Sequence, residues 1–166
     1  MKKIILLTIL VSFSFAHGQK IKYPTKTPPP STPDPIAAST FDEALAKELG
    51  ADDYGMRKYV MAFLKKGPNR TSDKDEAAKL QAAHMANIVK LAEEGKLAIA
   101  GPFLDDGVLR GIYIFNVETI EEAKKLTETD PAIKAGSLVM ELRPWYGSAA
   151  LGLVNKYHDK ISKVKM

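Results

Sequence analysis

Cysteine is absent from the 166 residues, and this absence excludes disulfide bonds, thiolate metal sites and a cysteine nucleophile. Only three histidines occur, and none has the paired spacing that is typical of a transition-metal site. The chain also contains no glycine-rich phosphate loop, no nucleophile elbow and no dinucleotide-binding fingerprint. We therefore expect a protein that folds on its core alone and carries neither a metal nor a cofactor.

Apolar runs long enough to cross a membrane are also missing. Residues 4–15 form an apolar stretch that follows two lysines and precedes the small residues Ala16 and Gly18. A spanning helix needs about 20 apolar residues, whereas this shorter pattern is typical of a secretory signal peptide. We expect residues 1–18 to be such a peptide, and the product to be periplasmic or secreted, without a membrane anchor.

Residues 19–40 contain little that a core would bury. Six prolines fall between Pro24 and Pro35, which favours an extended, disordered spacer. A proline-rich ligand for a partner domain is the alternative interpretation. The remaining residues, 41–166, have the size of one domain, whose core we place at residues 55–146.

Charge gives little indication of a partner. The formal net charge is +4 and the pI is near 9.1, but the lysines alternate with acidic residues on the expected helices. This pattern is typical of solvated faces, so we expect no nucleic-acid binding. The basic tail, residues 156–166, is either a frayed end or a segment that contacts an anionic surface.

The hydrophobic pattern predicts an α+β domain. Strands are expected at residues 57–64, 97–103, 110–117 and 137–144. A helix capped by Ser72 or Asp73 and ended by Gly95 should follow the first strand, a second helix should cover residues 119–128, and a terminal helix should follow Trp145, Tyr146 and Gly147. The order β-α-β-β-α-β predicts a ferredoxin-like sandwich with both helices on one face of an antiparallel sheet.

The first strand is apolar on both faces. Tyr59, Met61 and Phe63 alternate with Val60, Ala62 and Leu64. Residues 110–117 show the same pattern, and a strand that is apolar on both faces is buried on both. Helices cover one face, so we expect a second subunit to cover the other and form a homodimer through the sheets, with the terminal helix covering part.

One of the three histidines lies on a helix face that we expect to be buried. His84 shares a helix face with Leu80, Ile88 and Leu91, and a titratable ring among apolar side chains needs a polar partner. We nominate Asp130 as that partner. Its carboxylate would accept from one ring nitrogen and leave the other nitrogen as a general base or acid.

Asp130 also has a structural interpretation. It precedes Pro131 and can cap a short turn that ends at Gly136. The two roles are compatible, because a carboxylate has several acceptor positions.

Residues near the strand ends are candidates for ligand binding. Gly101 and Pro102 either end a strand or let a ligand approach the backbone. Arg110 can bind a carboxylate, as can Arg57 and Arg143, although arginines at strand ends are commonly solvated. We nominate Gly101, Pro102 and Arg110 as ligand-binding residues.

These features together resemble the YCII-related family. The resemblance is carried by the strand YVMAFL, His84, the Gly101-Pro102 pair, the strand GIYIFNV, the helix start ETIEEA and the Asp130-Pro131 pair. It implies a dimeric α+β barrel, in which two ferredoxin-like subunits pair through their sheets, with a cleft near the helix histidine. It also implies a His–Asp pair, which maps onto His84 and Asp130.

The resemblance leaves the substrate open. One branch of the family resembles a dehydrochlorinase that acts on a chlorinated hydroxyquinol, and the wider superfamily includes muconolactone isomerases. We expect a cofactor-independent enzyme that performs acid–base chemistry, such as elimination or isomerisation, on a small organic molecule. The alternatives are a module of the same fold that binds a small ligand without changing it, and an interaction protein of the cell envelope.

Overall fold

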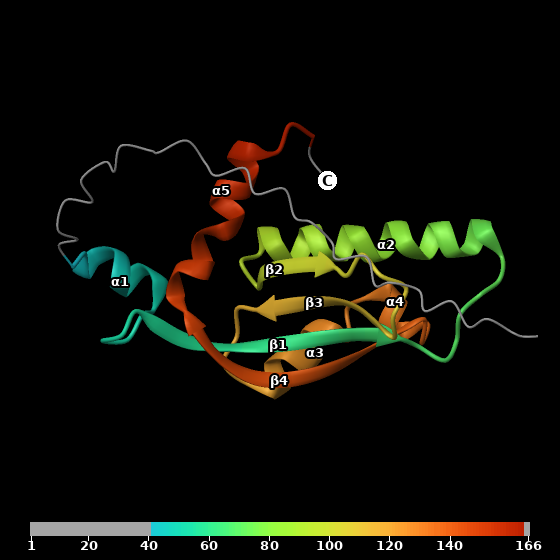
Figure 1. The fold of residues 1–166 in the computed structure, drawn as a ribbon, viewed down its shortest axis with the longest axis horizontal. Helices are drawn as coiled ribbons and strands as arrows, with labels where there is room; N and C mark the ends of the chain where they lie inside the picture. The colour runs from blue at the N-terminus through green and yellow to red at the C-terminus, as the bar shows by residue number, and fades with distance from the viewer. Residues whose placement is uncertain (1–40, 165–166) are drawn as a thin grey trace, which may run out of the picture. The chain divides into compact units, whose positions relative to one another are not determined.

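The computed structural model describes residues 41–164 (Figure 1). The expected signal peptide and spacer, residues 1–18 and 19–40, lie outside the described residues. Export of the protein therefore stays a prediction. Within the described part, no helix combines the length and the hydropathy that a membrane span requires.

Four antiparallel strands form one sheet. They are β1 (Met56–Lys66), β2 (Leu97–Pro102), β3 (Leu109–Phe115) and β4 (Leu138–Ser148). Their order across the sheet is β2-β3-β1-β4, so the first and third strands lie in the middle. With helices after β1 and β3, this topology confirms the ferredoxin-like α+β sandwich that the sequence predicts.

Capping residues set the limits of the main helices. Helix α2 (Lys74–Glu93) begins where the Asp73 side chain accepts from two backbone N–H groups, and Gly95, with a φ of 68°, ends it. Helix α3 (Ile120–Thr127) begins at the predicted Thr119 cap. Both helices pack on the same face of the sheet.

The main core lies between this face and the two helices. Val60, Ala62 and Leu64 of β1 meet Leu91 of α2 and Ala123 of α3, and all five are buried. The predicted alternation in β1 is therefore present. It places every second residue under the helices and directs the others to the opposite face.

The described residues cover only one end of the opposite face of the sheet. There Tyr59 packs against Trp145 and Leu151, the last of which belongs to the 3-10 turn η1 (Ala149–Leu153). Farther along, Met61 and Phe63 are only half-buried. The described part of the chain thus leaves apolar side chains on this face for something else to cover.

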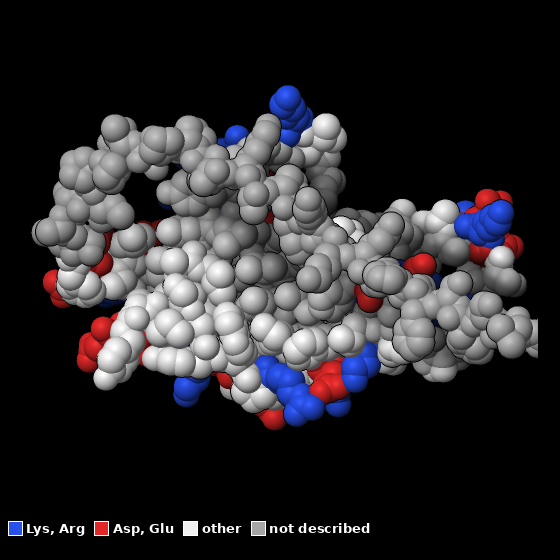
Figure 2. Space-filling model, viewed as in Figure 1, with Lys and Arg blue, Asp and Glu red and all other residues white. Residues whose placement is uncertain are grey.

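Charged side chains border the same open face. Glu141 on β4 forms ion pairs with Lys65 on β1 and with Arg143, its neighbour along β4. Figure 2 shows charges of both signs side by side below the centre of this view. The open face is thus apolar in its middle and has a charged edge.

One predicted strand limit near the end of the domain needs correction. β4 continues through Trp145 to Ser148, rather than ending at residue 144, because these residues pair with the start of β1. The predicted terminal helix is confirmed as α5 (Val154–Ile161), which follows η1. A short helix before the sheet, α1 (Glu43–Leu49), was not predicted, although Asp42 caps it and Gly50 ends it.

Candidate active site

His84 lies in the middle of α2 and faces the sheet. The residue is 7% exposed, so its ring is almost entirely removed from solvent. Its Nδ1 atom lies 2.7 Å from an Oδ2 atom of Asp130, which is 1% exposed. The structure thus brings together the two residues that the sequence pattern nominated, 46 positions apart in the chain.

Asp130 divides its two oxygens between two partners. Oδ2 faces His84, and Oδ1 accepts from the backbone N–H of Ala132 at 2.8 Å. Asp130 is thereby the N-cap of the short helix α4 (Pro131–Lys134), with Pro131 at its first position. The cap fixes the carboxylate, and the carboxylate in turn fixes the orientation of the imidazole.

Tyr113 on β3 completes a chain of three side chains. Its hydroxyl lies 3.3 Å from the Nε2 atom of His84, and the two rings are nearly parallel, at 18°. A carboxylate can only accept, so Nδ1 carries the imidazole proton and Nε2 accepts from the Tyr113 hydroxyl. The order of donation is Tyr113 to His84 to Asp130.

Burial gives Tyr113 a defined protonation state. The residue is 2% exposed, and loss of solvent raises the pKa of its hydroxyl, with a further increase from the negative charge of Asp130. The hydroxyl therefore keeps its proton throughout the neutral range. In this site Tyr113 is a hydrogen-bond donor and not a base.

Sequence reasoning did not include Tyr113 in the site. It did place Tyr113 within the expected strand at residues 110–117, which alternates like the first strand. A hydroxyl on a face that packs beneath the His84 helix needs a partner, and that requirement was the available signal.

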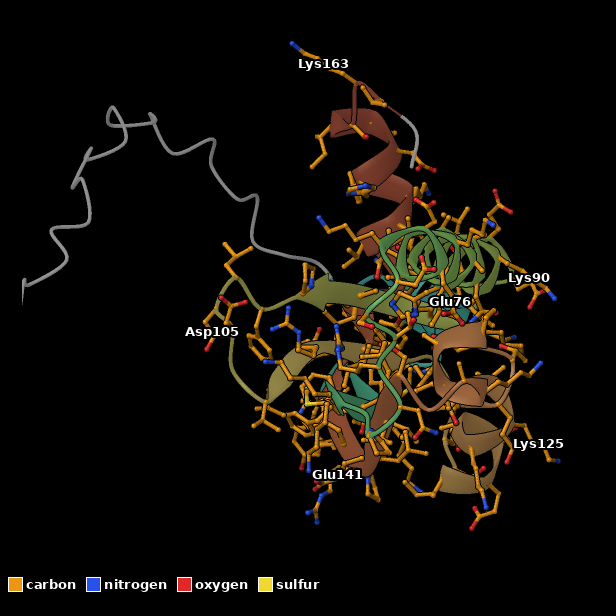
Figure 3. All side chains as sticks on the ribbon, turned by 90° about the vertical axis from the view of Figure 1, so that its right-hand side faces the viewer. Glu76, Lys90, Asp105, Lys125, Glu141 and Lys163 are labelled. Carbon is orange, nitrogen blue, oxygen red and sulfur yellow. The ribbon has the colours of Figure 1, made fainter. Side chains whose placement is uncertain are left out.

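A cavity of about 640 Å³ lies beside these three residues, between α2 and the sheet. Its walls include His84 and Tyr113, the apolar residues Leu64, Leu80, Met85, Ile88 and Leu138, and the strand residues Gly101, Pro102, Arg110 and Gly111. The three nominated ligand-binding residues therefore all line it. Figure 3 shows this end of the domain, where Asp105 marks the β2–β3 turn and Glu76 the start of α2.

The polar part of the lining is basic. Two arginines, Arg70 and Arg110, belong to it, and none of the described lining residues is acidic. Arg110 is held in place by the backbone carbonyl of Asp105, which accepts from its Nη1 atom at 3.1 Å. Its Nη1 atom also lies 3.9 Å from the carboxylate of the fully exposed Asp106. A negatively charged group on a ligand would meet a favourable potential here.

The other two candidate arginines lie outside this cavity. Arg57 donates to the Leu49 carbonyl and lies over the Tyr59 ring, while Arg143 pairs with Glu141 on the open face. Residues 41–164 also contain no group of three or more His, Asp or Glu side chains placed to hold a metal ion.

Fold and site together define an α+β sandwich protein with a buried His–Asp pair at the wall of a cavity large enough for a small molecule. The model of the YCII-related domain matches residues 58–146, just over half of the chain. The protein belongs to the YCII-related family, as the sequence motifs indicated.

Two known proteins illustrate the similarity. The uncharacterised protein YjpA of Bacillus subtilis strain 168 is 30% identical over 64 residues, which cover 39% of this chain and 73% of YjpA. The 5-chloro-2-hydroxyhydroquinone dehydrochlorinase TftG of Burkholderia phenoliruptrix AC1100, solved with 2,5-dihydroxybenzoquinone, is 24% identical, with a TM-score of 0.40 over 52% of this chain and 92% of TftG.

Proposed function

We propose that this protein is a cofactor-independent enzyme that uses His84 and Asp130 for general acid–base chemistry on a small organic molecule. Elimination and isomerisation are the reaction types that one such pair can serve. The observation that carries the proposal is the 2.7 Å contact between His84 Nδ1 and Asp130 Oδ2 at the wall of the cavity.

Each residue would have a distinct role. Asp130 holds the proton on Nδ1 and stabilises the imidazolium that forms when Nε2 takes a proton from the substrate. His84 then returns the proton to another atom of the substrate or to a leaving group. Arg110 would bind a negatively charged group on the substrate, and the backbone at Gly101 and Pro102 would form part of the wall.

Exchange of carbon-bound hydrogen tests the proposal even while the substrate is unidentified. A panel of small ketones, quinones and lactones is incubated with the full-length protein in D₂O, and deuterium uptake is followed by NMR. We expect His84→Ala to lower the exchange of any responding compound by about 100-fold or more, the usual contribution of general base catalysis. His158→Ala, on the exposed face of α5, is the matched control and should exchange at the wild-type rate. Exchange that survives His84→Ala would refute the mechanism.

The second candidate function is that of a binding module without catalysis. Both ring nitrogens of His84 already have partners, and a histidine satisfied in this way can be purely structural. A compound that binds in the cavity, with neither exchange nor turnover, would favour this function over the enzyme.

We also propose that the open sheet face pairs with a second copy of the chain. The half-buried Met61 and Phe63 support this assembly, because a sheet face that is apolar in its middle needs cover. Sedimentation of the Phe63→Glu variant tests it. We expect a monomer, whereas Tyr54→Glu, at a side chain that is 86% exposed, should sediment like the wild type. A wild-type monomer at micromolar concentration would contradict the proposal.

A further inference from the structure

The phenol of Tyr113 and the imidazole of His84 present opposite hydrogen-bonding groups at one point of the cavity wall. Tyr113 Oη and His84 Nε2 are 3.3 Å apart, and both residues line the cavity. Nε2 offers a lone pair, because the proton of the ring is held on Nδ1 by Asp130. Oη offers a proton, because burial keeps the phenol neutral.

In the structure these two groups satisfy each other. A phenol has a single O–H, which can rotate about the Cζ–Oη bond toward a different acceptor. When a ligand oxygen reaches Tyr113, the hydroxyl donates to that oxygen instead, and the lone pair of Nε2 becomes free. Binding of a suitable ligand therefore exposes the base at the same moment as it engages the donor.

We propose that Tyr113 is a second catalytic residue, which donates to the oxygen on which negative charge develops while His84 Nε2 removes a proton from the neighbouring carbon. This inference rests on the proposed function and names the substrate class. The class comprises carbonyl compounds with an acidic C–H group beside the carbonyl.

The spacing of the two protein atoms fits that class. In a C–C=O unit the oxygen lies about 2.4 Å from the α-carbon, given ordinary bond lengths. A donor and a base that are 3.3 Å apart can therefore approach the carbonyl oxygen and the α-hydrogen together. A base and a donor much farther apart would reach only one of the two.

The step is balanced without a co-reactant. The C–H bond breaks, its proton goes to Nε2, and its electron pair forms the C=C bond of an enolate, whose oxygen takes the carbonyl π electrons. Tyr113 stabilises that oxygen by a hydrogen bond, and the imidazolium is stabilised by Asp130. Return of the proton to another carbon completes an isomerisation, and departure of a leaving group completes an elimination.

Binding of 4-nitrophenolate tests the donor, because a phenolate oxygen resembles an enolate oxygen and its absorption reports hydrogen bonding. We expect the full-length wild type to bind 4-nitrophenolate, and Tyr113→Phe to bind it at least tenfold more weakly. Tyr59→Phe is the matched control, since the Tyr59 hydroxyl donates to backbone carbonyls of Ser148 and Ala149 on the opposite side of the sheet. This variant should bind like the wild type.

A second readout follows the histidine itself. The ¹⁵N chemical shift of His84 Nε2 should change on addition of 4-nitrophenolate, because the ligand takes the Tyr113 hydroxyl away from it. In Tyr113→Phe the shift should already have the altered value, while Nδ1 stays protonated. Thermal unfolding of each variant, followed by circular dichroism, confirms that it is folded.

Several results would overturn the inference. The wild type could fail to bind 4-nitrophenolate, or Tyr113→Phe could bind it equally well. Alternatively, α-hydrogen exchange could depend on His84 and be unchanged in Tyr113→Phe. The last of these refutes the role of Tyr113 and leaves the proposed function intact. Exchange that is independent of both residues refutes the proposed function, and with it a catalytic role for Tyr113, even where phenolate binding is lost.

Discussion

The carbonyl oxygen of Gly101 lies so close to Gly111 that a Cβ atom on Gly111 would come within 2.5 Å of it. The two glycines lie on β2 and β3, next to each other at the edge of the cavity. A Cβ atom on Gly101, in contrast, would meet no atom within 4 Å. Gly111 therefore allows two strands to approach, whereas a methyl group on Gly101 would enter open space.

This difference predicts that substitution by alanine destabilises the fold much more at Gly111 than at Gly101. Gly111→Ala should lower the free energy of unfolding by about 1–3 kcal/mol, because β2 must move away from β3. Gly101→Ala should change it by less than about 1 kcal/mol, and alanine in a strand can even be stabilising. Urea unfolding of both variants measures the contrast. Equal losses would show that the approach of the two strands is not the cause.

Asp130 should contribute more to the free energy of unfolding than an ordinary helix-capping residue does. Asp130→Ala removes the cap of α4 and leaves the Nδ1–H of His84 buried without its partner, which together cost about 2–4 kcal/mol. Asp73→Ala removes only the exposed cap of α2 and should cost about 1 kcal/mol. Denaturant unfolding at neutral pH compares the two, and similar losses would contradict the dual role of Asp130.

Alkaline pH should destabilise the fold through Tyr113. The pKa of its hydroxyl is raised by burial and by the charge of Asp130, so the folded state holds this proton where the unfolded state, with a pKa near 10, has released it. The stabilisation is complete below pH 10 and decreases as the pH rises further. The urea midpoint should therefore fall less steeply above pH 10 in Tyr113→Phe than in the wild type. Parallel curves would contradict the prediction.

Low pH should destabilise the fold by protonating Glu141 at the charged edge of the open face. The Lys65 ammonium lowers the pKa of the Glu141 carboxyl, and Arg143 lowers it further. A lowered pKa gives stability that is present above the unfolded value of 4.5 and is lost as the pH falls through the folded value. Between pH 5 and pH 3 the urea midpoint should decrease less in Glu141→Gln than in the wild type. Identical decreases would show that the ion pairs contribute nothing measurable.

The helix limits and the alternation of the strands could be predicted because each depends on residues that are close in the sequence. The caps at Asp73 and Thr119 and the stop at Gly95 depend on residues within one helical turn. The alternation along β1 depends only on the two-residue period of a strand. The contact of His84 with Asp130 was also predictable, since a buried imidazole requires a polar partner and the resemblance to the YCII-related family implied a His–Asp pair.

The remaining features depend on pairing across the sheet. β4 extends past Pro144 because its last residues meet Met56 and its neighbours on β1, a partner that no local window contains. Tyr113 joins the site because the register of β3 beneath α2 brings its hydroxyl to Nε2. Helix α1 escaped prediction because it is a single short segment of seven residues with no buried side chain.

Asp130 both caps α4 and binds the imidazole of His84, and these two roles affect how the sequences of related proteins are interpreted. Selection for a stable domain alone would keep an aspartate at this position, so its presence in another sequence is not evidence of chemistry. His84 caps no helix, and its ring nitrogens bind only the side chains of Asp130 and Tyr113. A relative with the aspartate retained and an aliphatic residue in place of the histidine would therefore be a protein that kept the scaffold and gave up proton transfer.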